Sequence, residues 1–140
     1  MDKYYAAAVN VLGAATTVTS IGAIQALKED EYLKYLTTCH RRRRDLAYSI
    51  FSKVPGVTLK PSESGILTWL DVSAIGSSKE VAEYLLQEAN VLVNDGSGYG
   101  ELGKGHLRIV TSVFKEDEKA REVFTRIAKA LEKLYLANNV

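Results

Sequence analysis

The chain has 140 residues, 46% of them apolar and 25% charged, a composition typical of one globular domain. Lysine and arginine number 18 and aspartate and glutamate 17, so the net charge of +1 gives no long-range field that would attract nucleic acid or an anionic membrane. The single cysteine, Cys39, cannot form an internal disulfide, and with two histidines it offers too few ligands for a metal site. The totals favour a soluble protein of the reducing cytoplasm, with no metal, no nucleic acid and no membrane partner.

The first predicted element is a helical segment rich in alanine and valine, from Ala6 to Leu27. Polar residues interrupt it too often for a membrane span, and it lacks the basic start of a signal peptide. We therefore expect residues 1–28 to form a helical segment that packs on another protein surface. That surface belongs either to a partner domain or to a second copy of the chain.

A second, longer helix is expected to begin at the acidic residues 29–31 and to end at Pro55-Gly56. Its apolar positions recur at spacings of three, four and seven residues, which predicts one buried stripe. Arg41 to Arg44 lie on this helix and point about 100° apart from one to the next, so they cannot all contact one phosphate backbone. We expect them to form a solvated, partly salt-bridged face. Cys39 is predicted in the core and His40 on the surface.

Two strand-like runs follow, Val57–Lys60 and Gly65–Val72, and the Pro-Ser-Glu-Ser sequence between them predicts a hairpin turn. Ser77 or Ser78 can cap the next helix, whose apolar residues share one face. A short strand is expected at Val91–Val93.

Five glycines between Gly96 and Gly105 predict a loop, and His106–Ser112 then has the alternation of a strand. In that strand Leu107 and Ile109 face the core, whereas Arg108 faces away from it. A long amphipathic helix from Lys115 completes the order helix, helix, strand, strand, helix, strand, strand, helix. This order predicts an α+β fold, a small mostly antiparallel sheet with helices packed on it, over residues 29–140.

The loop satisfies the spacing GxGxxG at Gly98, Gly100 and Gly103, and it nearly matches a phosphate-binding P-loop. Both motifs need a helix directly after the loop, whereas a strand follows here, and Gly105 occupies the position of the magnesium-binding Ser or Thr. Nucleotide binding is therefore disfavoured. Asp71 and Asp95 stand at strand ends, where turn-forming aspartates are commoner than catalytic ones, and no Ser–His–Asp or Cys–His arrangement has a familiar spacing.

The chain resembles the fold-type I enzymes that use pyridoxal phosphate (PLP), in particular the C-terminal small domain of class I/II aminotransferases. The resemblance runs from about Gly13 to Leu134. The residues that carry it are Thr19-Ser20, Gln25-Ala26-Leu27, Arg43-Arg44-Asp45, Pro61, Gly65, Trp69, Asp71, Val91–Val93, Gly96–Gly100, Gly103–Gly105 and His106-Leu107-Arg108-Ile109. Asn94-Asp95-Gly96, where aminotransferases often have Pro-Gly, is also similar to the C–S lyases of the cystathionine β-lyase type.

The resemblance implies that Arg108 binds the α-carboxylate of an amino acid or 2-oxo acid, and that Gly98, Tyr99 and Gly100 form a substrate-side loop. A guanidinium suits this role because it can donate two parallel hydrogen bonds to a carboxylate. The family's Schiff-base lysine and cofactor-binding residues belong to a large domain that these 140 residues do not match. We therefore expect PLP in the parent enzyme, none bound by this chain alone, and no catalytic residue here. A non-catalytic module that binds a carboxylate or a partner remains the other interpretation.

Overall fold

The computed structural model describes residues 1–13 and 16–139, and the chain forms two compact units, Met1–Thr37 and Thr38–Val140. Helix α3 (Asp30–Phe51) belongs to both units, because the division falls inside it. The predicted division into a segment of residues 1–28 and a domain of residues 29–140 stays a prediction.

The first unit contains α1 (Asp2–Leu12), α2 (Thr17–Ala26) and the start of α3. The single helix predicted over residues 6–27 is wrong, because α1 ends before Gly13, whose φ of 69° is a conformation that favours glycine. Residues 14 and 15 lie outside the described residues. Helix α2 buries no residue, and Val18 and Ile21 on it are 81% and 62% exposed.

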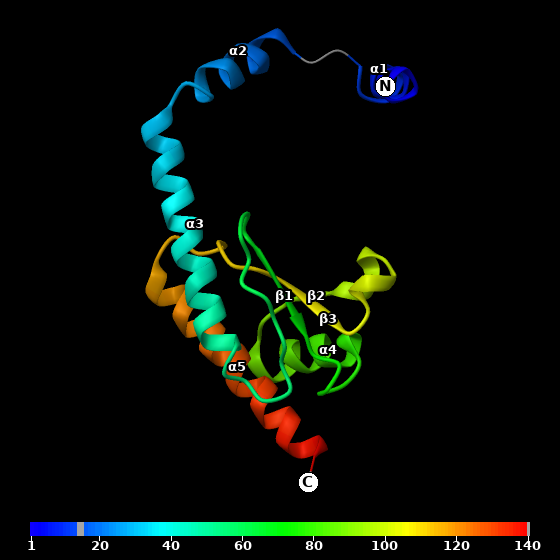
Figure 1. Cartoon of the computed structure of the whole chain (residues 1–140), viewed down its shortest axis with the longest axis vertical. Helices are drawn as coiled ribbons and strands as arrows, with labels where there is room; N and C mark the ends of the chain where they lie inside the picture. The colour runs from blue at the N-terminus through cyan, green and yellow to red at the C-terminus, as the bar shows by residue number, and fades with distance from the viewer. Residues whose placement is uncertain (14–15, 140) are drawn as a thin grey trace. The chain divides into compact units, whose positions relative to one another are not determined.

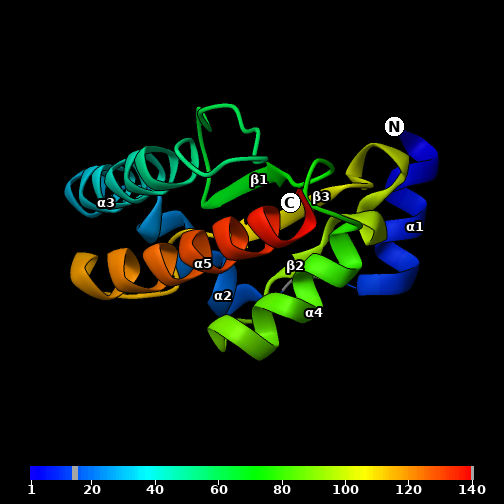
Figure 2. The ribbon, with the colours of Figure 1, turned by 90° about the horizontal axis from the view of Figure 1, so that it is seen from below.

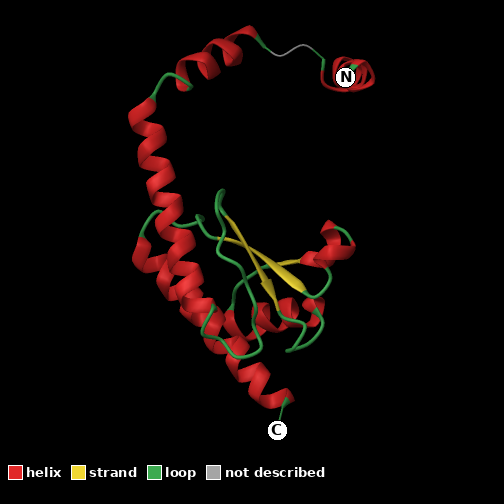
Figure 3. Ribbon diagram, in the orientation of Figure 1, coloured by secondary structure: helices red, strands yellow, loops and turns green. Residues whose placement is uncertain are grey.

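The second unit is built on an antiparallel sheet of β1 (Leu67–Asp71), β2 (Asn94–Asp95) and β3 (His106–Val110), shown in Figure 3. The strand order is β1-β3-β2, so β3 lies in the centre. Burial alternates along β1 and β3, as the side-chain period of two requires. One face of the sheet is therefore apolar and buried, and the other is partly open.

Residues 38–51 of α3, together with α4 (Ser78–Ala89) and α5 (Asp117–Asn138), pack on the buried face of the sheet, and this part of α3 lies beside α5 (Figures 1 and 2). The rings of Phe51 and Phe124 meet between α3 and α5, with centroids 5.5 Å apart. Helix α4 is capped by the preceding Ser77, whose Oγ accepts a hydrogen bond from the Glu80 backbone N–H. The largest fully buried side chains are Phe51, Phe124, Leu70, Leu85, Leu107, Ile127 and Leu131. The predicted α+β class is confirmed.

Two predicted strands are wrong in their extent. Val57–Lys60 contributes only a single bridge, Thr58 to Asp71, in place of a hairpin strand. Pro61 has no N–H to extend the ladder, and the carbonyls of the following turn accept hydrogen bonds from Arg44. Val91–Val93 precedes the strand, which is Asn94–Asp95: the left-handed Asn90 ends α4, and pairing with β3 begins at Asn94.

The arginine run is only partly solvated. Arg41 and Arg42 are exposed, but Arg43 is 4% exposed and donates to the Asp117 carboxylate and to the carbonyls of Phe114 and Lys115. The predicted solvated face is therefore wrong for Arg43, which connects α3 to the start of α5. Cys39 and His40 are both half-buried rather than core and surface residues.

Candidate functional site

Arg108 lies at the middle of β3, on the partly open face of the sheet. Its direct partners across the two neighbouring strands are Trp69 of β1 and Asn94 of β2. Residues directly opposite in antiparallel strands point to the same face, so these three side chains form one row. Leu107 and Ile109, on either side of Arg108, are buried on the opposite face. Arg108 therefore points away from the core, as the alternation of the strand predicted.

The protein binds the Arg108 guanidinium through one of its nitrogens. Nη1 donates to Asn94 Oδ1 at 3.2 Å and to the Tyr99 hydroxyl oxygen at 3.3 Å. Within residues 1–13 and 16–139, no group accepts a hydrogen bond from Nε or Nη2. These two nitrogens form the edge that can grip a carboxylate with two parallel hydrogen bonds. Arg108 is thus held from one side and leaves a complete bidentate edge for a ligand.

The loop that carries Gly98, Tyr99 and Gly100 reaches the same place as Arg108. It is folded into two short 3₁₀ turns, Gly96–Tyr99 and Glu101–Gly103. The Tyr99 ring lies under the guanidinium, with Arg108 Cζ 5.1 Å from the ring centroid, which is cation–π distance. Of the three loop residues predicted beside a substrate, Tyr99 is the one whose side chain contacts Arg108.

The two 3₁₀ turns of this loop pack against each other at Gly96 and Gly103, whose backbones lie close together. A Cβ on Gly96 would lie 2.3 Å from the Gly103 carbonyl oxygen, and a Cβ on Gly103 would lie 2.0 Å from the Gly96 carbonyl oxygen. A larger residue at either position would force the two turns apart. Of the three GxGxxG glycines only Gly103 takes part in this packing, because a Cβ on Gly98 or Gly100 would meet nothing within 4 Å. A strand follows the loop instead of a helix.

The two carboxylates at strand ends stabilise turns. Hydrogen bonds from the Ser97 and Ser78 side chains and from the Ser97 backbone N–H hold the pKa of Asp95 below its usual range. Hydrogen bonds from Ser73 likewise lower the pKa of Asp71. A lowered pKa keeps a carboxyl ionised at neutral pH, so neither group suits the part of a general acid. The turn-forming interpretation of both aspartates agrees with these bonds.

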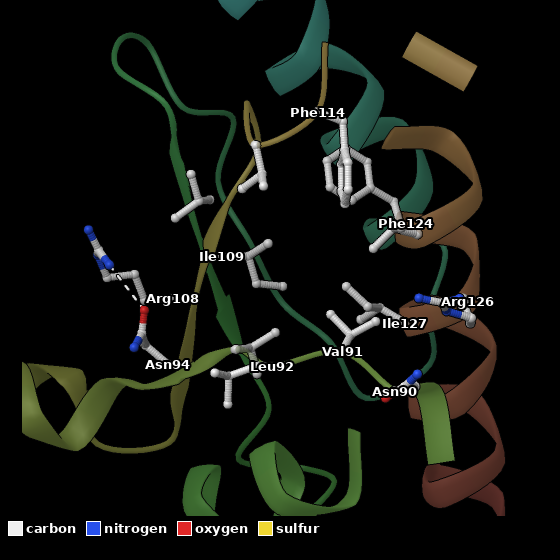
Figure 4. A pocket seen from close by; sticks show the side chains of 14 residues that line it. Asn90, Val91, Leu92, Asn94, Arg108, Ile109, Phe114, Phe124, Arg126 and Ile127 are labelled. Atoms are coloured by element: carbon white, nitrogen blue, oxygen red, sulfur yellow. Dashed lines mark hydrogen bonds between the residues drawn. The ribbon is translucent and has the colours of Figure 1, made fainter. Parts of the chain in front are cut away.

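A separate apolar cleft of about 300 Å³ lies between β3 and α5 (Figure 4). Val91, Ile109, Phe124 and Ile127 line its interior, whereas the Arg108 side chain stands at its edge and points away from it. Arg126 also lines the cleft, but it forms an ion pair with Glu122, and most of the other lining residues are apolar. The polar site is the open sheet face on the other side of β3.

The residues present do not fit the cofactor that the resemblance implies. A Schiff-base lysine needs a site that favours its neutral amine, yet every lysine of the described residues is exposed. Glu88 raises the pKa of Lys133, which is the opposite of what such a lysine requires. The part of the chain that the structure describes also contains no cluster of three metal-binding side chains and no helix long and apolar enough to cross a membrane.

Trp69 and Asn94 belong to this site but were not predicted in it. Strand alternation places Trp69 on one face of β1, and Asn94 stands beside the glycine loop in the sequence. The register that sets both opposite Arg108 joins strands far apart along the chain, and no local pattern fixes it.

Fold and site together define an α+β domain that presents one arginine, held by its neighbours, on the open face of a small sheet. The family model for aminotransferase class I and II matches residues 4–127, and the chain belongs to this family. It is similar to an aspartate aminotransferase of Pyrococcus horikoshii, with 31% identity over 126 residues. That match covers 87% of this chain but only 32% of the relative.

Solved structures agree with this assignment. An alanine aminotransferase from Pyrococcus furiosus matches with a TM-score of 0.67 and 28% identity over 74% of this chain and 26% of its own. Cystalysin from Treponema denticola, a structure that contains pyridoxal 5'-phosphate, shares the fold with a TM-score of 0.58 at 23% identity, over 66% of this chain and 24% of its own. The chain thus spans about a third or less of the length of these proteins.

Proposed function

We propose that the chain acts as the C-terminal small domain of a PLP-dependent aminotransferase, and that Arg108 binds the carboxylate of its amino-acid or 2-oxo-acid substrate. The observation that carries the proposal is the free Nε–Nη2 edge of a guanidinium whose Nη1 is already fixed by Asn94 and Tyr99. A fork oriented in this way loses less conformational freedom when a carboxylate binds. Membership of the family supports the reaction, amino-group transfer.

The cofactor belongs, on this proposal, to the part of the parent protein that the relatives have beyond the length of this chain. PLP supplies an electron sink for the amino acid when it is bound there. This chain would contribute substrate binding and orientation, and Tyr99 with its flanking glycines Gly98 and Gly100 would border the substrate. A C–S lyase with the same domain is the alternative that Asn94-Asp95-Gly96 favours.

Titration of the purified chain with a 2-oxo acid tests the role of Arg108. Trp69 is the single tryptophan and lies directly across the strands from Arg108, so its fluorescence can follow pyruvate binding. One bidentate contact on an open face predicts a dissociation constant on the order of millimolar or weaker. Arg108→Ala should abolish the signal, and Arg108→Lys should restore little because an ammonium lacks the fork.

Arg126→Ala is the matched control for this titration, since Arg126 is an exposed arginine on α5 that forms an ion pair with Glu122. Loss of binding in the Arg126 variant as well would show that net charge alone attracts pyruvate, and the proposal would fail. Binding much tighter than millimolar would instead favour a non-catalytic carboxylate-binding module that works without a second domain.

PLP titration with borohydride reduction and mass spectrometry tests where the cofactor belongs. We expect no saturable adduct on any one lysine, because all of them are exposed. A specific adduct would place a cofactor site inside this chain and overturn that part of the proposal.

We infer further that the segment of residues 6–27 packs on the rest of the parent protein or on a second copy, in a cytoplasmic enzyme whose free cysteine, Cys39, fits a reducing compartment. Val18, Ile21, Ile24 and Leu27 are all exposed in this segment. Sedimentation of the chain at increasing concentration should reveal self-association that is lost in a variant beginning at residue 29. A wild-type chain that stays monomeric throughout would remove the second copy from this inference.

A further inference from the structure

Tyr99 is an exposed aromatic residue with little part in the core of the domain. Its side chain is 54% exposed, yet both its hydroxyl and its ring contact Arg108. The hydroxyl accepts from Nη1, and the ring centroid lies 5.1 Å from the Cζ atom of the guanidinium. The two contacts act on different parts of the guanidinium, so together they fix its plane as well as the position of Nη1.

Trp69 holds the Tyr99 ring in turn. The two rings meet edge to face, with centroids 5.6 Å apart and planes at 88°. Trp69 also packs against His106, with centroids 6.2 Å apart. Because Trp69 is directly opposite Arg108 in the sheet, it supports Tyr99 from a position that the strand register fixes.

The backbone beneath Tyr99 is fixed by Asp95. Its carboxylate accepts hydrogen bonds from the Ser97 N–H and hydroxyl and from Ser78 Oγ at the start of α4. Asp95 thereby caps the 3₁₀ turn that ends at Tyr99 and joins this turn to α4. Tyr99 is therefore positioned by the fold, although solvent reaches half of its surface.

We propose that Tyr99 is the positioning residue of Arg108, a role that rests on the proposed function of this arginine. Tyr99 and Asn94 share Nη1, and the ring of Tyr99 keeps the guanidinium plane turned so that Nε and Nη2 stay available to a carboxylate. Without the ring, Arg108 retains its charge and its bond to Asn94 but loses the surface that fixes its plane. The ring sets the affinity for a carboxylate through orientation rather than through a contact of its own with the ligand.

The test compares the 140-residue chain with Tyr99→Leu and Tyr99→Phe. Nitrogen-15 relaxation of the Arg108 Nε–H group, assigned by its absence in Arg108→Lys, measures the order of the guanidinium without any ligand. Pyruvate titration then measures affinity. Tyr99→Leu should reduce the order of Nε–H and raise the dissociation constant about 5-fold, while Tyr99→Phe, which keeps the ring, should stay within about 2-fold of wild type.

Tyr48→Leu is the matched control, since Tyr48 is a partly exposed tyrosine on α3, whereas the side chains that contact Arg108 are Asn94 and Tyr99. It should change neither the order of Arg108 nor the affinity. Trp69→Leu is a second route to the same effect and should lower the order of Arg108 while Tyr99 remains in place. A purely structural role of Tyr99 would change unfolding instead, and would leave Nε–H as ordered as in wild type in the folded chain.

The outcomes separate the two proposals. If Arg108→Ala abolishes pyruvate binding while Tyr99→Leu leaves both order and affinity unchanged, Arg108 keeps its function and the positioning role of Tyr99 is overturned. If wild type binds no pyruvate but Tyr99→Leu releases the guanidinium, the positioning role stands and the proposed function of Arg108 fails.

Discussion

Arg43 and Arg108 differ in how completely the protein satisfies them. Arg43, on α3, is buried, and each of its three guanidinium nitrogens donates to an oxygen of the segment that begins α5. Arg108, on β3, is half-exposed, and among the described residues its hydrogen bonds come from Nη1 alone. Both lie at points where the sequence resembles the family, so the resemblance alone does not distinguish their roles.

The difference shows how an arginine that builds a fold can be told from one that awaits a ligand. A buried guanidinium whose three nitrogens all donate to the protein has no free bidentate edge for another molecule. An oriented guanidinium with one free edge has its geometry fixed and its binding capacity unused. We therefore expect opposite responses when the two arginines are replaced: a loss of stability at residue 43 and a loss of carboxylate binding at residue 108.

The largest expected effect is at Arg43. Arg43→Ala should lower the free energy of unfolding by about 3 kcal/mol, because it leaves the carbonyls of Phe114 and Lys115 without their donors and removes the buried partner of the Asp117 carboxylate. Urea unfolding followed by Trp69 fluorescence measures this change in the unit of residues 38–140.

Arg42 is the matched control, because it pairs with the same carboxylate, Asp117, while its side chain is 56% exposed. Arg42→Ala should cost less than about 1 kcal/mol, as exposed ion pairs do. Equal losses in the two variants would mean that burial of Arg43 adds nothing, and the comparison between the two arginines would lose its basis.

A smaller effect should appear in the pH dependence of stability. Hydrogen bonding from Arg43, with a further contribution from Arg42, lowers the pKa of Asp117. A carboxyl with a depressed folded-state pKa contributes stability that is present above its unfolded pKa of about 3.9 and is lost as the pH falls through the folded value. Asp117→Asn should therefore be less stable than wild type at pH 6, and this deficit should shrink as the pH falls below the unfolded pKa of about 3.9 toward the lower folded value.

Urea unfolding at a series of pH values between 6 and 2.5 measures that trend. Glu122→Gln is the control, since Lys119 lowers the pKa of Glu122 but the pair is exposed. Its deficit at pH 6 should be the smaller of the two. A deficit in Asp117→Asn that stays constant down to pH 2.5 would show that the lost ionic bond is not its cause.

Apolar periodicity in the sequence predicted most of the fold, because it shows which side of a strand or helix is buried. The alternation around Leu107 and Ile109 gave the core face of β3, and the apolar period after Lys115 gave the long helix α5. The predicted extents of the strands at Val57–Lys60 and Val91–Val93 were wrong, because the extent of a strand depends on hydrogen bonds to residues distant in the sequence. Val57–Lys60 is followed by a turn whose carbonyls accept hydrogen bonds from Arg44 on α3, and a local pattern does not reveal such a distant donor.

The candidate site was predicted only in part, for a related reason. Arg108 and Tyr99 could be named from the resemblance, but their mutual contact depends on the folding of the glycine loop back over β3. The structural role of Arg43 was missed because a run of four arginines has the same appearance in sequence whether one of them is buried or none is. Burial of a charge depends on distant partners such as Asp117, which no periodicity within α3 indicates.

The smallest expected effect on stability is at Arg108, and it completes the contrast with Arg43. Arg108→Ala removes two long hydrogen bonds at a half-exposed position and leaves no buried donor or acceptor unsatisfied. The free energy of unfolding should therefore change by no more than about 0.5 kcal/mol, as at ordinary surface sites. Urea unfolding beside Arg43→Ala measures this change, with circular dichroism as the signal, because Trp69 fluorescence itself responds to replacement of its cross-strand neighbour. A loss approaching that of Arg43 would mean that the fold, rather than a ligand, requires Arg108, and the free guanidinium edge would then have no part in substrate binding.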